Sequence, residues 1–179
     1  MEQEYQKHYR LCTMSLNLRF AAIADAEVIA GYNAAMALET EHITLDGERL
    51  LQGVRAVLGD ATKGFYIVAE SDGQVVGQMM ITFEWSDWRN ANFWWIQSVY
   101  VHRDFRQQGV FRSLYRFAME RAEQDPGVCG LRLYVEAQNH NAQRTYERLG
   151  MKRTPYRMYE VDFVLGRPEK NLQVPGGLE

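Results

Sequence analysis

The sequence predicts an α/β (α+β) fold, in which a mixed sheet carries helices on both faces. Short β-rich runs alternate with helical patterns along all 179 residues. An Asp-Gly pair between two of these runs favours a hairpin, and hence an antiparallel pair of strands. The later strand-helix-strand-helix units are typical of a sheet with a ligand crevice. With 46% hydrophobic residues the chain can bury one substantial core.

The first half of the chain predicts a strand, two helices and a hairpin. Asp25 is the expected N-cap of the first helix, which runs to about Leu38. The hairpin turn is Ser71-Asp72-Gly73-Gln74, between two runs rich in β-formers. In order, the expected elements are a strand over 16–23, the first helix, a helix over 46–58, and strands over 64–70 and 75–85.

The second half alternates strands and helices. Gly150 stands in the C′ position of the second of these helices and is expected to end it. The expected elements are a strand over 93–101, a helix over 111–122 with one apolar face, a strand over 131–135, a helix over 139–149 and a strand over 156–164. The complete order is therefore β-α-α-β-β-β-α-β-α-β.

The expected domain organisation is a single domain over residues 15–166. Residues 1–14 read as a poorly ordered extension, and residues 167–179, rich in Pro and Gly, as a tail. We expect neither to carry the chemistry.

Charge and cysteine usage exclude several classes of function. The net charge is only −3 and basic residues are spread along the chain, which argues against nucleic acid as a partner. Cys12 and Cys129 lack zinc or disulfide-scaffold spacing, so no metal is expected and a reducing compartment is favoured. Residues 1–10 lack the apolar core of a signal peptide, and no apolar run approaches a membrane span. These observations predict a cytoplasmic protein without a membrane partner.

A turn suited to phosphate lies between the strand that ends at Val101 and the following helix. Its sequence, HRDFRQQGVF, leads into a helix N-terminus, where backbone N–H groups and the helix dipole favour an anion. Gly109 allows close approach of the backbone, and Arg106 and Arg112 add positive charge on either side. The alternative is a tight turn with solvated arginines, which an isolated R-x-x-G-x-F would favour.

A second motif follows about thirty residues later, in the helix over 139–149. Asn139 can cap this helix, while Ala142 and Tyr146 lie four residues apart on one face. A small residue there makes room for a ligand arm, and a hydroxyl reaches over it. The alternative is an ordinary amphipathic helix with Tyr146 in the core.

Together the two motifs resemble the signatures of the GNAT acetyltransferase superfamily. The first signature is Gln/Arg-x-x-Gly-x-Gly/Ala, and the second is Asn-x-x-Ala-x-x-x-Tyr before Leu-Gly-Met, which is present at 149–151. The resemblance covers residues 64–164. The first motif departs from the pattern at Arg103, where proline is common, and at Phe111, where a small residue is usual. The Phe111 ring must therefore point away from a bound diphosphate, and we expect it to pack under the sheet.

The resemblance implies a fold, a cofactor and an activity. The fold is a mostly antiparallel sheet of six to seven strands that splays between the fourth and fifth. The activity is transfer of the acetyl group of acetyl-CoA to an amine of a small molecule or a peptide, without a metal. Tyr146 is the expected general acid, because a phenol with a pKa near ~10 can protonate a leaving thiolate. The residues implied in cofactor binding are Val99, Tyr100, Val101, Arg106, Gln107, Gln108, Gly109, Val110, Phe111, Arg112, Asn139, Ala142 and Tyr146.

The general base and the acceptor site are less defined by the sequence. Glu84 and Glu136 lie near the expected cleft, and Glu84 is the candidate base, although either can be a solvated carboxylate. The expected loop over 84–92 carries Trp85, Trp88 and Asp87, which with Glu84 would form an aromatic, anionic lip for a cationic amine. For the adjacent Trp94 and Trp95, core or dimer contact is the favoured interpretation.

Two alternatives stay open at this level. A non-catalytic acyl-CoA sensor or interaction domain would keep the fold and the phosphate turn. A different nucleotide-binding domain with an accidental turn would bind ATP or NAD instead. The identity of the amine, the choice between acetyl and a longer acyl donor, and a possible homodimer are not determined by the sequence.

Overall fold

The computed structural model describes residues 15–164. The described chain divides into two compact units, with the boundary between Tyr134 and Val135. The expected extension (1–14) and tail (167–179) lie outside the described residues. The single domain expected over 15–166 stays a prediction.

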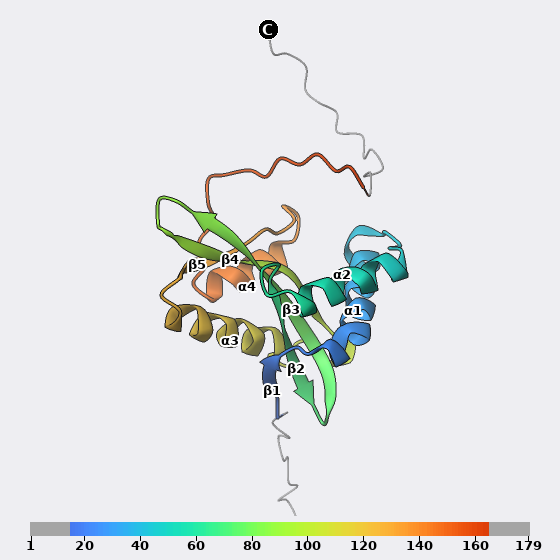
Figure 1. The fold of residues 1–179 in the computed structure, drawn as a ribbon. Helices are drawn as coiled ribbons and strands as arrows, with labels where there is room; N and C mark the ends of the chain where they lie inside the picture. Colours follow the sequence, from blue (N-terminus) through green and yellow to red (C-terminus); the bar gives the residue numbers. More distant parts are fainter. Residues whose placement is uncertain (1–14, 165–179) are drawn as a thin grey trace, which may run out of the picture. The chain divides into compact units, whose positions relative to one another are not determined.

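The first unit is built on a five-stranded mixed sheet in the order β1-β2-β3-β4-β5 (Figure 1). Three of the neighbouring pairs are antiparallel, and only β4 and β5 run parallel. The mixed, mostly antiparallel sheet is therefore confirmed. The strands are β1 (Asn17–Phe20), β2 (Phe65–Ser71), β3 (Gln74–Ser86), β4 (Ala91–Val101) and β5 (Val128–Leu133).

Helices cover both faces of this sheet, as predicted. On one face α1 (Ala26–Glu41) and α2 (Gly47–Gly59) form a core with β2, in which Ile29, Val54 and Val68 are buried. On the other face α3 (Val110–Gln124) packs so closely that a Cβ added at Gly77 would lie 2.9 Å from a methyl of Val110. Figure 1 shows α3 on the opposite side of the strands from α1 and α2.

The predicted hairpin is present between β2 and β3. Asp72 and Gly73 have φ angles of 50° and 77°, the left-handed pair that a type I′ turn requires. The next connection is shorter than expected. β3 and β4 stay paired from Glu84↔Phe93 to Ser86↔Ala91, so the predicted loop over 84–92 is reduced to a turn over 87–90.

Asp25 precedes the first helix, as predicted, but it is not a side-chain cap. Its carboxylate accepts hydrogen bonds from the Ala22 N–H (2.7 Å) and from Arg19 (2.7 and 2.9 Å). The bonds from Arg19 hold the pKa of Asp25 below its usual range. Arg19 also binds Glu70 at 2.7 Å, so this ion-pair group joins β1, β2 and the start of α1.

The second unit contains α4 (His140–Arg148), with both predicted ends confirmed. Asn139 caps it, since its side-chain oxygen accepts from the Ala142 N–H at 3.0 Å. At the other end Gly150 has φ 90° and donates to the Glu147 carbonyl, while Met151 donates to that of Tyr146. This pair of bonds is the Schellman motif, which glycine at C′ makes possible.

The strand predicted over 156–164 is wrong. These residues form no strand in the structure. Tyr156, Tyr159 and Phe163 are 81%, 91% and 92% exposed. A strand exists only by hydrogen bonding to a neighbour, and this segment pairs with no strand of the described chain. The predicted count of six to seven strands is corrected to five among residues 15–164.

Candidate functional site

The site begins where β4 and β5 separate. Their parallel ladder starts at Asn92↔Val128 and ends at Ile96↔Leu133. β4 continues to Val101, paired with β3 on its other side. Within the described residues, the edge of β4 that faced β5 carries no further ladder. This is the opening predicted between the fourth and fifth strands, and Val99, Tyr100 and Val101 lie along it.

Two buried polar atoms of β4 near this opening have no hydrogen-bond partner in the described chain. They are Oγ of Ser98, beyond the end of the β4–β5 ladder, and Nε1 of Trp95, a residue that still pairs with Arg132 within it. Ser98 stands opposite Met80, which packs on the core with α1 and α2, so Ser98 faces that side of the sheet. An unpaired buried polar atom costs about 1–3 kcal/mol. A ligand that hydrogen-bonds these atoms would remove that cost. Nothing in the spacing of these two residues marks them in the sequence.

The predicted phosphate turn has the required backbone geometry. A short 3-10 helix, Arg103–Phe105, follows β4. Gln107 and Gly109 then take left-handed φ angles of 63° and 86°, and α3 starts at Val110. First-turn N–H groups of a helix have no acceptor within the helix and attract anions. A Cβ built at Gly109 meets no atom within 4 Å, so no protein side chain crowds this glycine. Free backbone N–H groups at a helix N-terminus are the kind that bind a diphosphate.

The other side chains of the turn differ in their contacts and exposure. The Phe111 ring lies against the Tyr115 ring, with centroids 6.2 Å apart, one turn further along α3. Arg112 is exposed at the start of the helix, and Val110 is buried. The Gln108 amide donates to the Asp104 carbonyl at 2.8 Å and closes the turn.

Arg106 is held by partners within the protein. Its guanidinium donates to Glu39 of α1 at 2.7 Å and to the Val101 carbonyl at 2.9 Å, and it lies 5.3 Å from the centre of the Tyr100 ring. The Tyr100 hydroxyl donates to the other oxygen of Glu39 at 2.9 Å. The bond from Arg106 holds the pKa of Glu39 below its usual range, and burial raises the pKa of Tyr100. The phosphate turn is thereby attached to α1.

Replacing Glu39 with Gln is expected to lower the free energy of unfolding by about 0.2–1 kcal/mol at neutral pH, because the ion pair with Arg106 is half-exposed. The folded-state pKa of Glu39 is depressed, so its contribution is present above the ordinary pKa of 4.5 and is lost as the pH falls below it. Thermal unfolding of the wild type and the variant at pH 7 and pH 3 measures the loss of stability and its dependence on pH. Glu41→Gln, an exposed change at the end of the same helix, is the control. An equal loss at both pH values would contradict the role given to the ion pair.

The candidate base Glu84 lies on the face of the sheet that carries α1 and α2. Its Oε1 accepts a hydrogen bond from Arg132 of β5, while Oε2 has no donor in the described chain. The Phe93 ring stands opposite Glu84 in the ladder and lies between two guanidinium groups, Arg132 at 3.6 Å and Arg89 at 4.9 Å from its centre.

The predicted aromatic, anionic lip does not lie on one face, because Glu84 and the adjacent Trp85 alternate along β3, and its charge is not simply anionic. Trp85 and Trp88 are 59% and 88% exposed. However, Arg132 neutralises Glu84, and Arg89 belongs to the same turn. Trp94 is buried, in agreement with the core interpretation. The sequence does not predict Arg132 and Arg89 at this place, because β5 and the turn over 87–90 meet β3 only in the folded chain.

Tyr146 lies on α4, four residues after Ala142 and half-buried. Burial raises the pKa of Tyr146, so its phenol is protonated at neutral pH. A neutral phenol is the form that can give a proton.

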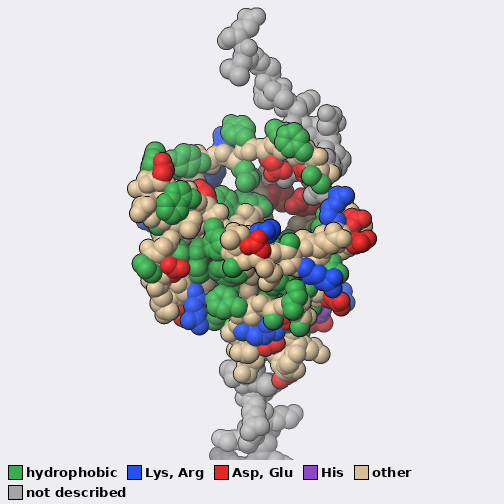
Figure 2. All heavy atoms as spheres, in the orientation of Figure 1, with side chains coloured by type: hydrophobic (Ala, Val, Ile, Leu, Met, Phe, Trp, Pro, Cys, Tyr) green, Lys and Arg blue, Asp and Glu red, His purple; other side chains and the backbone are tan. Residues whose placement is uncertain are grey.

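Residues 15–164 include no group of three or more His, Cys, Asp or Glu side chains that would bind a metal. None of their helices combines the length and apolar character that a bilayer span requires. Cys129 of β5 is a free thiol. On the face shown in Figure 2 basic side chains are scattered singly, most of them near acidic ones.

Comparison with known proteins identifies the family. Residues 18–151 match the model of the Acetyltransferase (GNAT) family. The chain therefore belongs to the GNAT family of acetyltransferases. This match includes both motifs and the opening between β4 and β5.

Relatives of known structure or function agree with this assignment. A possible acetyltransferase from Clostridium difficile 630 is 44% identical, with a TM-score of 0.78 over 83% of this chain and 98% of that one. The mycothiol acetyltransferase of Corynebacterium aurimucosum is 30% identical over 129 residues, 70% of this chain and 42% of the relative. The chain thus spans less than half the length of that relative. An aminoglycoside N-acetyltransferase solved with CoA shares the fold, with a TM-score of 0.68 at 15% identity over 84% of this chain and 96% of that one.

Proposed function

We propose that the protein is an N-acetyltransferase that transfers the acetyl group of acetyl-CoA to an amine. The observation that carries this proposal is the opening of β4 beyond Ile96, followed directly by the left-handed turn at Gly109 and the N-terminus of α3. An extended arm fits the first feature and a diphosphate the second. The family and the names of its relatives support the acyl donor and the amine acceptor.

The chain's own groups bind the donor in two places. The first-turn amides of α3, with Gln107, Gln108 and Gly109, bind the diphosphate, and exposed Arg112 adds charge. The unpaired backbone edge at Val99 and Val101 binds the amides of the pantetheine arm, as an added strand would. Arg106 acts here through Glu39, by fixing the turn. Bound acetyl-CoA supplies an activated acetyl thioester.

In this proposal a backbone N–H near Val99 polarises the acetyl carbonyl. Two side chains, Tyr146 and Glu84, transfer protons. When the neutral amine nitrogen bonds to the acetyl carbon, the carbon–sulfur bond breaks and the Tyr146 phenol donates its proton to the leaving sulfur. The proton that this nitrogen loses on forming the amide returns through solvent to the Tyr146 phenolate. Asn139 and Ala142 shape the same helix face. Glu84 Oε2, which has no donor in the described chain, accepts a proton from the ammonium form of the acceptor. Such a base is needed because only about one alkylamine molecule in a thousand is unprotonated at neutral pH.

Two measurements, made one after the other, test the proposal. A thermal-unfolding screen compares CoA, ATP and NAD. CoA at a hundred times its Kd should add about 2.7 kcal/mol to stability, while ATP and NAD should add little. Stabilisation by ATP or NAD instead would indicate a different nucleotide-binding domain. Thiol release from acetyl-CoA is then followed with a panel of small amines, peptide α-amines and lysyl peptides. Binding of CoA without turnover on any amine would favour the acyl-CoA sensor.

Location and assembly are separate predictions. A cytoplasmic location is expected from the sequence. The sequence does not determine whether the chain forms a homodimer, and sedimentation of the full chain measures this.

A further inference from the structure

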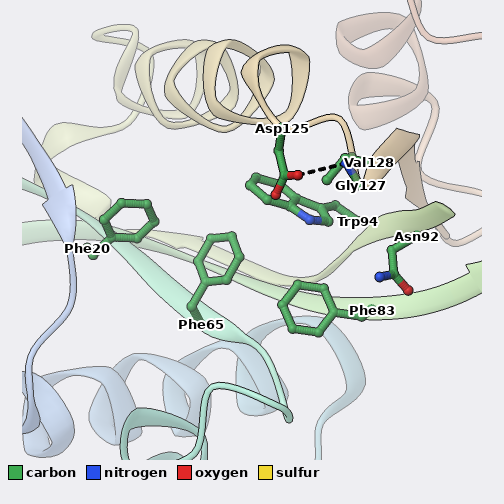
Figure 3. Close-up of a pocket in the computed structure, with 8 residues that line it drawn as sticks. All are labelled: Phe20, Phe65, Phe83, Asn92, Trp94, Asp125, Gly127 and Val128. Atoms are coloured by element: carbon green, nitrogen blue, oxygen red, sulfur yellow. Dashed lines mark hydrogen bonds between the residues drawn. The ribbon is translucent and has the colours of Figure 1, made fainter.

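A cavity of about 580 Å³ opens on the face of the sheet that carries α3 (Figure 3). Small-molecule sites typically enclose about 300–1,000 Å³. Residues of all five strands line the cavity, together with residues of the connection that follows α3. The lining residues are Phe20, Phe65, Phe83, Asn92, Trp94, Asp125, Gly127 and Val128.

Four aromatic rings form the apolar wall. Phe65 lies at the centre, edge-on to Trp94 at 4.9 Å and to Phe20 at 5.4 Å, and 6.0 Å from Phe83. Figure 3 shows the three phenylalanine rings side by side across β1, β2 and β3, with the indole under the end of α3. Phe20 and Phe83 remain 48% and 38% exposed. Mutual contacts therefore hold the rings in place, while part of their surface is left for a ligand.

The charge of the cavity is negative. Asp125 is the one ionisable residue among the described residues that line it. Its Oδ1 accepts from the Gly127 N–H at 2.8 Å, and its Oδ2 has no donor in the described chain. Asp125 is also the C-cap of α3, where the helix dipole places partial negative charge. Aromatic faces also attract cations, because the ring quadrupole places negative potential over each face.

The cavity is separate from the proposed acetyl-transfer site. The phosphate turn stands at the N-terminus of α3 and Asp125 at its C-terminus, and 15 helical residues span about 22 Å. Phe83 and Trp94 point to the α3 face. Their neighbours Glu84 and Phe93 point to the opposite face, because successive side chains of a strand alternate.

We propose that this cavity binds a small organic cation with an apolar body, such as an arylalkyl ammonium. The rings enclose the apolar body, and the positive group lies between the aromatic faces and Oδ2 of Asp125. This inference goes beyond the proposed acetyl transfer and does not depend on it.

Titration calorimetry of the full chain with benzyltrimethylammonium tests this site, since a quaternary ammonium cannot be acetylated. We expect saturable binding roughly tenfold tighter than that of the neutral 3-phenylpropanol. Asp125→Asn retains the acceptor for Gly127 and should remove this preference for the cation. Phe83→Leu should weaken both ligands. Glu123→Gln, an exposed acid near the same helix end, and Glu84→Gln, on the other face, should change neither.

Three binding results would each overturn the proposal. They are equal affinity for the cation and the alcohol, unchanged cation binding in both Asp125→Asn and Phe83→Leu, and loss of cation binding in Glu84→Gln, which would place the ligand on the acceptor face. If Asp125→Asn fails to fold, calorimetry of Phe83→Leu with the cation and the alcohol still tests the proposal. A dimer that Phe83→Leu dissociates would assign the cavity to a second copy of the chain and contradict a small-molecule ligand.

Discussion

Replacing Tyr146 with Phe is expected to lower kcat roughly 100-fold or more, with little change in the KM for acetyl-CoA. The substitution removes the phenol proton but keeps the ring on α4, and general acids typically contribute about 10²–10⁴-fold. Steady-state kinetics with the best amine from the panel measure both constants.

The pH dependence of the same variant separates an acid from a structural residue. Burial raises the pKa of Tyr146, so the wild-type rate should fall only at pH values above the ordinary tyrosine pKa. Below that pH the rate should rise as the amine loses its proton. The variant should keep the rise and lose the fall. Tyr159→Phe, at a tyrosine that is 91% exposed, is the matched control. A Tyr146→Phe enzyme with more than half the wild-type kcat would refute the assigned role.

Replacing Gly109 with Ala is expected to raise the KM for acetyl-CoA roughly tenfold or more. The new methyl group would meet no protein atom within 4 Å. In the proposed complex it would instead crowd the diphosphate that the backbone N–H groups of this turn bind. Because φ at Gly109 is +86°, the folded state should also lose about 1 kcal/mol.

Gly73→Ala gives the control for this backbone strain. Gly73 has φ +77° in the β2–β3 turn, and its added Cβ also meets no atom within 4 Å. Both variants should lose a similar free energy of unfolding, but only Gly109→Ala should weaken acetyl-CoA binding, which kinetics and titration calorimetry with CoA measure. An unchanged KM for acetyl-CoA in Gly109→Ala would show that this turn does not bind the diphosphate.

Most local elements could be predicted because their signals lie in neighbouring residues. Asp72-Gly73 specifies a left-handed turn, Asn139 caps the helix that follows it, and Gly150 ends that helix. The error over 156–164 has the opposite origin. A β-rich composition shows that residues can enter a sheet, but a strand also needs a neighbour, and composition does not supply one.

The amino-acid sequence by itself determined the order of the elements, the family motifs and the position of the phosphate turn, because each depends on spacing within about a dozen residues. Only the tertiary structure decided which distant side chains meet. It joined Glu39 to Arg106 across 67 positions and Arg132 to Glu84 across 48. It also brought four aromatic rings and Asp125 into the lining of one cavity. Such contacts arise where the strands of the sheet and the helices on its faces bring remote segments together, and no local pattern encodes the partner.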